Sequence, residues 1–192
     1  SLFSVYWSLS ASILNSPAGP HTLKNVWFYD KQKLRIGIVR SPYSNYEDDT
    51  ITKTVQSFAS GLPKDRFQVQ TVDLTQVLNG VAQIHKNIYN KSLSYYFQPE
   101  RARGETFSKV LEEIFVLGDR VSTSEYRNNL LVLPAVRNEV AKKIADFDLL
   151  IAPSTATIAP KRGEVEREDT SLFWTLLHLP TISLPLFQDS TS

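Results

Sequence analysis

The amino-acid sequence predicts an α/β fold, because short apolar runs rich in β-branched residues alternate with longer segments of helical periodicity. Four of the short runs are typical of strands, at residues 34–39, 67–74, 149–152 and 181–184. The last two are each followed directly by a proline, which cannot donate to a sheet ladder. At 192 residues the chain is long enough for one sizeable domain.

The first segment is predicted to be a buried helix. Residues 2–14 place apolar side chains at helical spacing, and Pro17 disfavours a helical residue before it. A secretory signal is disfavoured because serines interrupt the run and no basic region precedes it. No run reaches the roughly 18 apolar residues that a membrane span needs, so we expect no membrane partner. Because the chain contains no methionine, we expect it to be part of a longer or processed product.

A strand, a helix and a second strand are predicted next, as in a βαβ unit. Residues 34–39 form the first, buried strand, and residues 67–74 alternate as a half-buried strand does. The helix between them has Asp48 at its positive end and Gly61 near its C-cap, while Thr75 is available to cap the following helix. The apolar face of the helix between the strands comprises Ile51, Val55, Phe58, Ala59 and Leu62.

Three helices are predicted in the middle of the chain. We expect Gly118 to end the second helix and Pro134 to kink or break the third. The third helix begins at Ser122 with the spacing of a capping box, because Glu125 follows three residues later. These helices form an insertion that covers the sheet or lines a cleft, and cover is the commoner role. Their apolar faces are Leu78, Val81, Ile84, Ile88 and Tyr95; Phe107, Val110, Leu111, Ile114 and Phe115; and Tyr126, Leu130, Leu133, Val140 and Ile144.

Residues 147–187 contain the features that are most typical of a pocket. A strand ends at Pro153 and runs into a loop of small hydroxyl residues; a charged stretch, a short helix with Trp174 and the strand at 181–184 follow. Hydroxyls at the exit of an apolar strand are typical of the rim of a pocket in an α/β sheet. For Trp174, a core position is the simpler interpretation.

Composition and motif content argue against several function classes. The net charge is +1 with no basic block, which gives no reason to expect nucleic acid or an anionic membrane as a partner. Without cysteine there is no disulfide, thiolate nucleophile or cysteine metal site. The three histidines are far apart in sequence, so a zinc site is not expected. The sequence predicts no cofactor and no metal. No residue decides the compartment, and we favour the cytoplasm.

A triad of Ser154, Asp169 and His178 is one conceivable catalytic arrangement, since triad order is not fixed across folds. The simpler interpretation is structural. His178 precedes a Leu-Pro entry into a strand, and Asp169 caps the helix that carries Trp174. We therefore do not predict a catalytic residue within this chain.

Several stretches, taken in order, resemble the C-terminal part of amidase-signature enzymes. Residues 147–155, followed by Ala159-Pro160, resemble the family's FDxLLxPT…AP strand and loop. Residues 179–185 resemble its N-x-x-G-x-P-A-x-x-x-P strand entry. Earlier, residues 34–39 resemble its LRIGV strand, and residues 124–126 resemble the S-x-x-E-Y start of a later helix. The resemblance spans nearly the whole chain.

The resemblance implies hydrolysis of an amide bond by a serine nucleophile, with a second serine in a cis peptide and a lysine base. None of these residues maps onto this chain, which would begin just after the Gly/Ser-rich segment that contains them. The implied fold is a mixed β-sheet flanked by helices, in which residues 1–192 are a single domain or the C-terminal part of a larger one. The implied partners are a small-molecule amide substrate and the N-terminal catalytic half of the same protein. Alone, the chain is expected to be inactive.

We predict substrate-binding residues from their position near the C-terminal exit of a strand, where ligands bind in open α/β sheets. His178 stands where the family usually has glycine, and Thr181 where it has alanine. Because glycine tolerates positive φ, the backbone at His178 is of particular interest. The alternative function is a non-catalytic α/β module that binds a small molecule. The predicted substrate-binding residues are Ser154, Thr155, Thr157 and Trp174.

Overall fold

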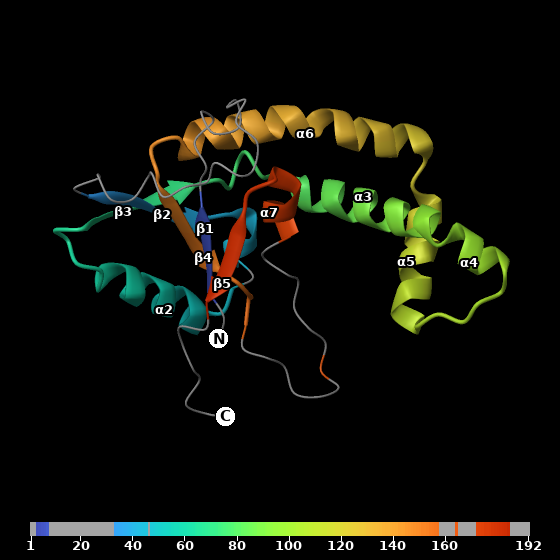
Figure 1. Ribbon diagram of the computed structural model, residues 1–192, viewed down its shortest axis with the longest axis horizontal. Coiled ribbons are helices and arrows are strands. Elements are labelled where there is room, and N and C mark those ends of the chain that lie inside the picture. The colour runs from blue at the N-terminus through green and yellow to red at the C-terminus, as the bar shows by residue number, and fades with distance from the viewer. Residues whose placement is uncertain (1–2, 8–32, 46, 158–163, 165–171, 185–192) are drawn as a thin grey trace, which may run out of the picture.

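A computed structural model describes residues 3–7, 33–45, 47–157, 164 and 172–184 (Figure 1). In these residues, five strands form one mixed sheet in the order β3-β2-β4-β1-β5, with helices on both faces. The predicted fold class, a mixed β-sheet flanked by helices, is confirmed. The strands are β1 (Phe3–Trp7), β2 (Leu34–Arg40), β3 (Phe67–Asp73), β4 (Leu149–Pro153) and β5 (Thr181–Leu184).

The sheet combines a parallel half with an antiparallel half. Strand β2 runs parallel to both β3 and β4, and its residue Ile36 lies opposite Val69 and Leu149. Strand β1 runs antiparallel to β4 and β5, so it separates these two strands. The β2–β3 pair comes from the predicted βαβ unit, whose strands are joined by α2 (Asp49–Ser60), whereas β4 pairs with β2 only after the middle helices in the chain.

The prediction of a helix over residues 2–14 is wrong at Phe3–Trp7, which form β1. Alternate residues of this stretch, Phe3, Val5 and Trp7, are also apolar, so the sequence fits a strand as well as a helix. Pairing with β4 on one side and β5 on the other decides between the two periods. Residues 8–14 lie outside the described part of the chain.

Two predicted helix boundaries are wrong. Thr75 does not cap the next helix, because its N–H donates to Asp73 Oδ1 at 2.8 Å and the helix begins later, with Gly80 at the cap in a left-handed conformation (φ 77°). Gly118 lies inside a helix and allows close packing instead: a Cβ there would lie 2.6 Å from the carbonyl carbon of Asn90. The helices after α2 are α3 (Val81–Tyr96), α4 (Gln98–Ala102), α5 (Lys109–Arg120), α6 (Thr123–Ile144) and α7 (Leu172–Leu177).

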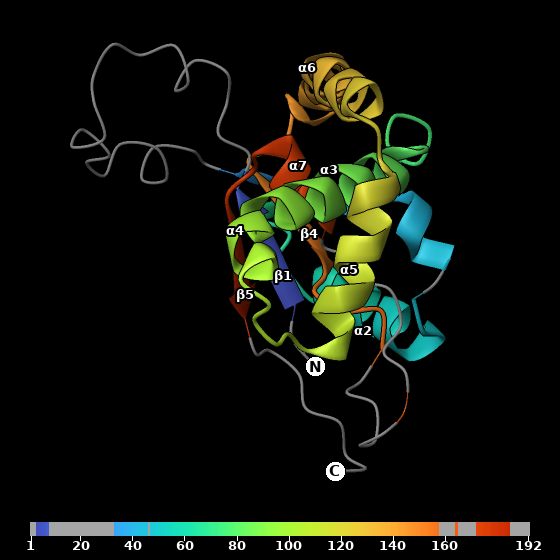
Figure 2. The same cartoon turned by 90° about the vertical axis from the view of Figure 1, so that its right-hand side faces the viewer.

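The predicted start of α6 is confirmed. Of the predicted kink or break at Pro134, the break is absent, because one helix runs from Thr123 to Ile144, and the kink stays a prediction. Ser122 Oγ accepts a hydrogen bond from the Glu125 N–H at 3.1 Å, as in a capping box. The helix continues through Pro134, because Leu133 and Val140 on either side are both buried in the core and hold the two halves against it. Figure 2 shows α5 lying beside α3, and the two helices pack against each other.

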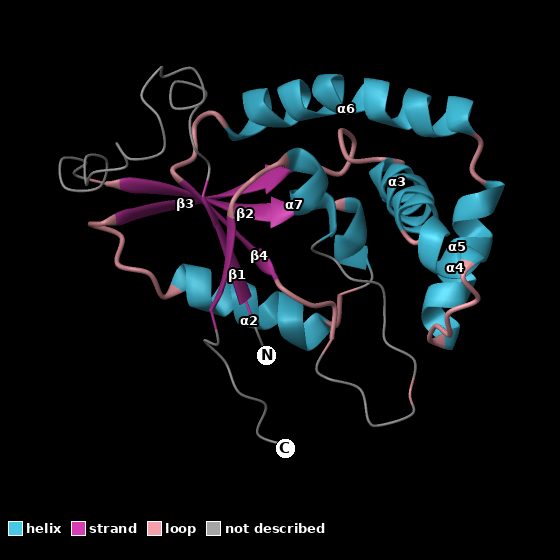
Figure 3. Cartoon of the chain, turned by 45° about the vertical axis from the view of Figure 1, so that its right-hand side comes forward, coloured by secondary structure: helices cyan, strands magenta, loops and turns pink. Residues whose placement is uncertain are grey.

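Separate apolar clusters lie on the two faces of the sheet, and Figure 3 shows helices on both sides of that sheet. Alternation along the strands decides the separation: on β4, Leu150 and Ala152 face one way and Ile151 faces the other. Helices α3, α6 and α7 cover the first face, and α2 covers the second. Of the three predicted middle helices, α3 and α6 therefore act as cover, as expected, whereas α5 packs against α3.

Candidate functional site

The predicted hydroxyl loop follows β4 and is anchored at both sides. Ser154 is half-buried, and its Oγ lies 3.0 Å from Ser183 Oγ on β5. Thr155 is exposed, and its Oγ1 donates to the carbonyl of Thr157 at 2.8 Å. The carbonyl of Ala156 accepts from the Asp48 N–H at 2.8 Å, which ties the loop to the start of α2. The loop therefore presents hydroxyls from a fixed backbone.

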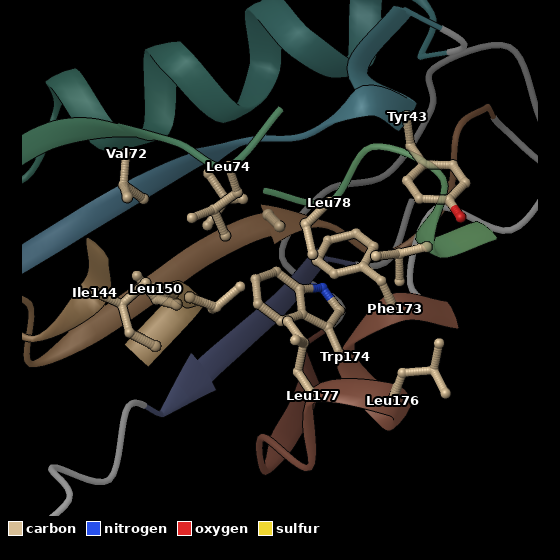
Figure 4. Packing of buried hydrophobic residues seen from close by; sticks show 14 of the residues in the cluster. Tyr43, Val72, Leu74, Leu78, Ile144, Leu150, Phe173, Trp174, Leu176 and Leu177 are labelled. Carbon is tan, nitrogen blue, oxygen red and sulfur yellow. The ribbon is translucent and has the colours of Figure 1, made fainter. Parts of the chain in front are cut away.

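Trp174, the fourth predicted binding residue, lies in the core. Its side chain is only 1% exposed and packs against Phe173, with ring centroids 4.3 Å apart (Figure 4). Phe173 in turn stacks on Tyr43 at 5.6 Å. The interpretation of Trp174 as a core aromatic is confirmed. Its role toward substrate stays a prediction, as do the roles of the three hydroxyl residues.

His178 has the positive φ that the comparison with glycine suggested, at 57°. The reason is the end of α7: the Leu179 N–H donates to the Trp174 carbonyl at 3.3 Å, and the His178 N–H to the Thr175 carbonyl at 3.1 Å. This is the bonding of a Schellman motif, which requires a left-handed residue just after the helix. The His178 ring contacts Arg137 of α6, with Nε2 and Nη2 2.8 Å apart. Asp169 of the conceivable triad lies outside the described residues.

A groove of about 900 Å³ lies between α2 and strands β2 and β3. Arg40, Glu47 and Pro153 line it at the carboxyl ends of β2 and β4, and Lys33 and Lys64 line it at the opposite ends of the strands. Burial raises the pKa of the Glu47 carboxyl, and hydrogen bonds from Thr52 and Ser44 oppose that rise. The floor of the groove is apolar and half-buried, which means that α2 covers this face of the sheet incompletely. The floor includes Ile38, Leu62, Phe67 and Val69.

Sequence reasoning missed Ser183, Arg137 and Glu47. Ser183 lies within a predicted strand, and no local pattern links its hydroxyl to that of Ser154, 29 positions earlier. No local pattern links Arg137 to His178, because the two residues are 41 positions apart and meet only through packing. Glu47 precedes a helix, and a charged residue in such a position usually faces solvent, so no local pattern marks it as part of a groove.

In the described ranges, no group of three or more His, Asp or Glu residues is placed to hold a metal ion. No helix in this same part of the chain is long and apolar enough to cross a membrane.

Together, these features describe an α/β protein with a mixed sheet and a hydroxyl-bearing loop at the exit of an inner strand. The sequence matches the family model described as "Amidase" over residues 8–187. This chain belongs to the amidase family, and the family indicated by its motifs is confirmed.

Solved structures include a similar fold. A structure titled "Crystal structure of amidase" is 21% identical, with a TM-score of 0.66, and the match covers 77% of this chain and 37% of that one. The chain therefore spans little more than a third of that amidase. At this identity the likeness is one of fold. No curated protein matches.

Proposed function

We propose that this chain is the C-terminal portion of an amide-bond hydrolase, in which it supplies sheet strands, covering helices and part of the substrate pocket. The observation that carries the proposal is the family match over residues 8–187, in a chain that covers only 37% of a solved amidase. The catalytic serines and lysine that the resemblance implies would lie upstream. The chain alone would then be inactive.

In this proposal, Ser154, Thr155 and Thr157 form part of the wall of the pocket. Hydroxyls both donate and accept, so they suit an amide substrate, which carries an acceptor oxygen and a donor N–H. The Ser154–Ser183 pair at 3.0 Å would limit the rotation of both hydroxyls. These residues would change how tightly the substrate binds and leave the bond-breaking chemistry to the upstream serine.

The test uses the longest natural product that contains this chain. We expect a serine-reactive fluorophosphonate to label it and amides to be cleaved. Ser154→Ala should raise KM about three- to tenfold, as expected for the loss of one hydrogen bond, and leave labelling intact. The matched control is Ser57→Ala, at an exposed serine on α2. Absence of both labelling and cleavage would refute the proposal that the longer protein is an amide-bond hydrolase.

The alternative is a non-catalytic module that binds a small molecule, and the groove beside α2 is the observation that favours it. With about 900 Å³ it is large enough for a small ligand. The same labelling experiment separates the two functions, because a binding module has no activated serine.

The proposed position within a larger sheet also predicts the behaviour of residues 1–192 alone. Strands β3 and β5 are the edges of the described sheet, and Ile182 and Leu184 of β5 are 47% and 36% exposed. Unpaired apolar edges promote association, so the isolated chain should self-associate in analytical ultracentrifugation. A monomeric chain with a sharply cooperative melt would count against the proposal that residues 1–192 are part of a larger sheet.

A further inference from the structure

The turn between α7 and β5 is held by a side chain from a distant helix. Within the Schellman motif, the carbonyls of Trp174 and Thr175 are bonded by the backbone of the turn. The carbonyl of Leu176 accepts from Arg137 Nε of α6 at 2.8 Å. A guanidinium therefore completes the C-terminal cap of α7, since the last carbonyls of a helix have no partner within it.

The same guanidinium fixes the chemical state of His178. Arg137 Nη2 lies 2.8 Å from His178 Nε2, and a guanidinium only donates. The ring nitrogen must therefore accept, which requires a neutral imidazole with its proton on Nδ1. Two bonds in a fork from one side chain hold both the helix end and the residue with positive φ, a geometry that lysine cannot reproduce.

Within the part of the chain that the structure describes, Arg137 is the charged residue that contacts His178 from the elements around the turn. The sequences of α7 and β5 contain no ionisable side chain. On α6, Glu139 pairs with Lys142 at 2.6 Å, and on α3, which also packs near α7, the ring of His85 stacks on Tyr89. Loss of the guanidinium would therefore remove the charged side-chain contact that these elements make with the ring.

The turn leads directly to the hydroxyl pair of the candidate site. Five residues after His178, Ser183 lies on β5 with its Oγ 3.0 Å from that of Ser154. Strand β5 pairs with β1 along one edge only in the described sheet, so its position depends on where the turn releases it. A change at Arg137 is therefore transmitted to Ser183 through the start of a short strand.

We propose that Arg137 is a positioning residue for the candidate pocket: it fixes the left-handed turn at His178 and thereby holds the Ser183 hydroxyl beside Ser154. The part of this inference that concerns substrate rests on the proposed function. The part that concerns the turn and β5 can be measured without any activity.

The first experiment measures amide hydrogen exchange at residues 178–184 and the imidazole ¹⁵N shifts of His178 in the longest natural product. Arg137→Lys keeps the charge but loses the fork. We expect exchange in β5 to rise about tenfold and the Nδ1–H tautomer to lose its dominance. Arg127→Lys, at an exposed arginine on the same helix, is the matched control and should change neither. Equal exchange and shifts in the Arg137 variant and wild type would overturn the proposal.

The second experiment compares KM and kcat. Arg137→Lys and Ser183→Ala should each raise KM about three- to tenfold with kcat unchanged, and the double variant should be no worse than the more affected single variant. Additive single effects, or an unchanged KM in the Arg137 variant, would refute positioning. If wild type cleaves no amide while the exchange difference persists, the proposed function alone fails.

Discussion

The two faces of the sheet differ sharply in how completely this chain covers them. On the face beneath α3, α6 and α7, the side chains of Leu150, Phe173 and Trp174 are at most 2% exposed. On the face beneath α2, Phe67 and Val69 remain half-buried beside an open groove. One face is closed by the chain itself and the other is not.

The difference indicates where the stability of this chain resides. Apolar burial is the main favourable term in folding, so the closed face should contribute most of it. The open face retains apolar surface that further protein could bury, which supports the proposal that the chain is part of a larger enzyme. Substitutions on the two faces should therefore have unequal effects.

The largest effect is expected from Trp174→Ala. This side chain is among the largest fully buried ones on the closed face, and truncating it leaves a cavity between α7 and the sheet. We expect a loss of about 3–5 kcal/mol in the free energy of unfolding, measured by urea titration with circular dichroism.

Val55→Ala on α2 is the counterpart on the open face. Val55 is 3% exposed, but its cluster contains only two other fully buried residues, Ile36 and Ile151. The expected loss is about 1–2 kcal/mol, from the two methyl groups removed. Equal losses in the two variants would contradict the asymmetry.

Gly118→Ala tests whether the cover of the closed face behaves as one unit. A Cβ at Gly118 would lie 2.6 Å from the carbonyl carbon of Asn90 and 2.8 Å from Ser94 Cβ, so α5 would have to move away from α3. The expected loss is about 2–3 kcal/mol, although alanine is the better helix former.

Gly61→Ala is the matched control, because Gly61 has a φ of −80° and its nearest neighbour would lie 3.4 Å from the new Cβ. It should be close to neutral. A neutral Gly118→Ala would show that α5 can shift without disturbing the cover of the sheet.

Sequence periodicity was sufficient for most elements of both faces, but not for β1 or for the contacts between distant elements. The strands at β2, β4 and β5 and the start of α6 at Ser122 follow from apolar runs, prolines and a capping box, all of which are local signals. Strand β1 could not be recognised, because its residues fit two periods and its neighbours are more than 140 positions away in sequence. The same limit applies to Gly118, whose small size matters only to a helix that precedes it.

The candidate site shows the same division between local and distant information. The hydroxyl loop after β4 was predictable, since strand exits are local features. The backbone at His178 was singled out by the family resemblance and not by a local pattern. Ser183 and Arg137 were not predictable, because their partners lie 29 residues away at Ser154 and 41 residues away at His178. Contacts between distant segments require the packed structure.

Phe67→Ala tests the open face directly. The ring of Phe67 is half-buried in the groove, so its loss should cost the 192-residue chain about 1 kcal/mol, less than either core substitution. In the longest natural product the loss should be larger if further protein covers the groove. Thermal or urea unfolding of both forms measures this difference, and an identical loss in both would show that the groove stays open.

Glu47→Gln gives the smallest expected effect and reports on the same groove. Burial raises the pKa of Glu47 in the folded state, so the folded chain retains its proton at pH values where the unfolded chain has lost it. The free energy of unfolding therefore falls as pH rises from the ordinary glutamate pKa of 4.5 to the raised pKa. Above the raised pKa, the loss in free energy stays constant.

Glutamine does not ionise, so the Glu47→Gln variant does not lose stability in this way as pH rises. The variant should be more stable than wild type at pH 7 by less than about 1 kcal/mol, since solvent screens a partly exposed group, and the difference should vanish near pH 3. Glu113→Gln, at an exposed carboxylate on α5, is the matched control for removing one negative charge. A stabilisation that instead grows toward low pH would contradict the raised pKa. Further protein over the groove would bury Glu47 more deeply, so the stabilisation at pH 7 should be greater in the longest natural product than in the 192-residue chain.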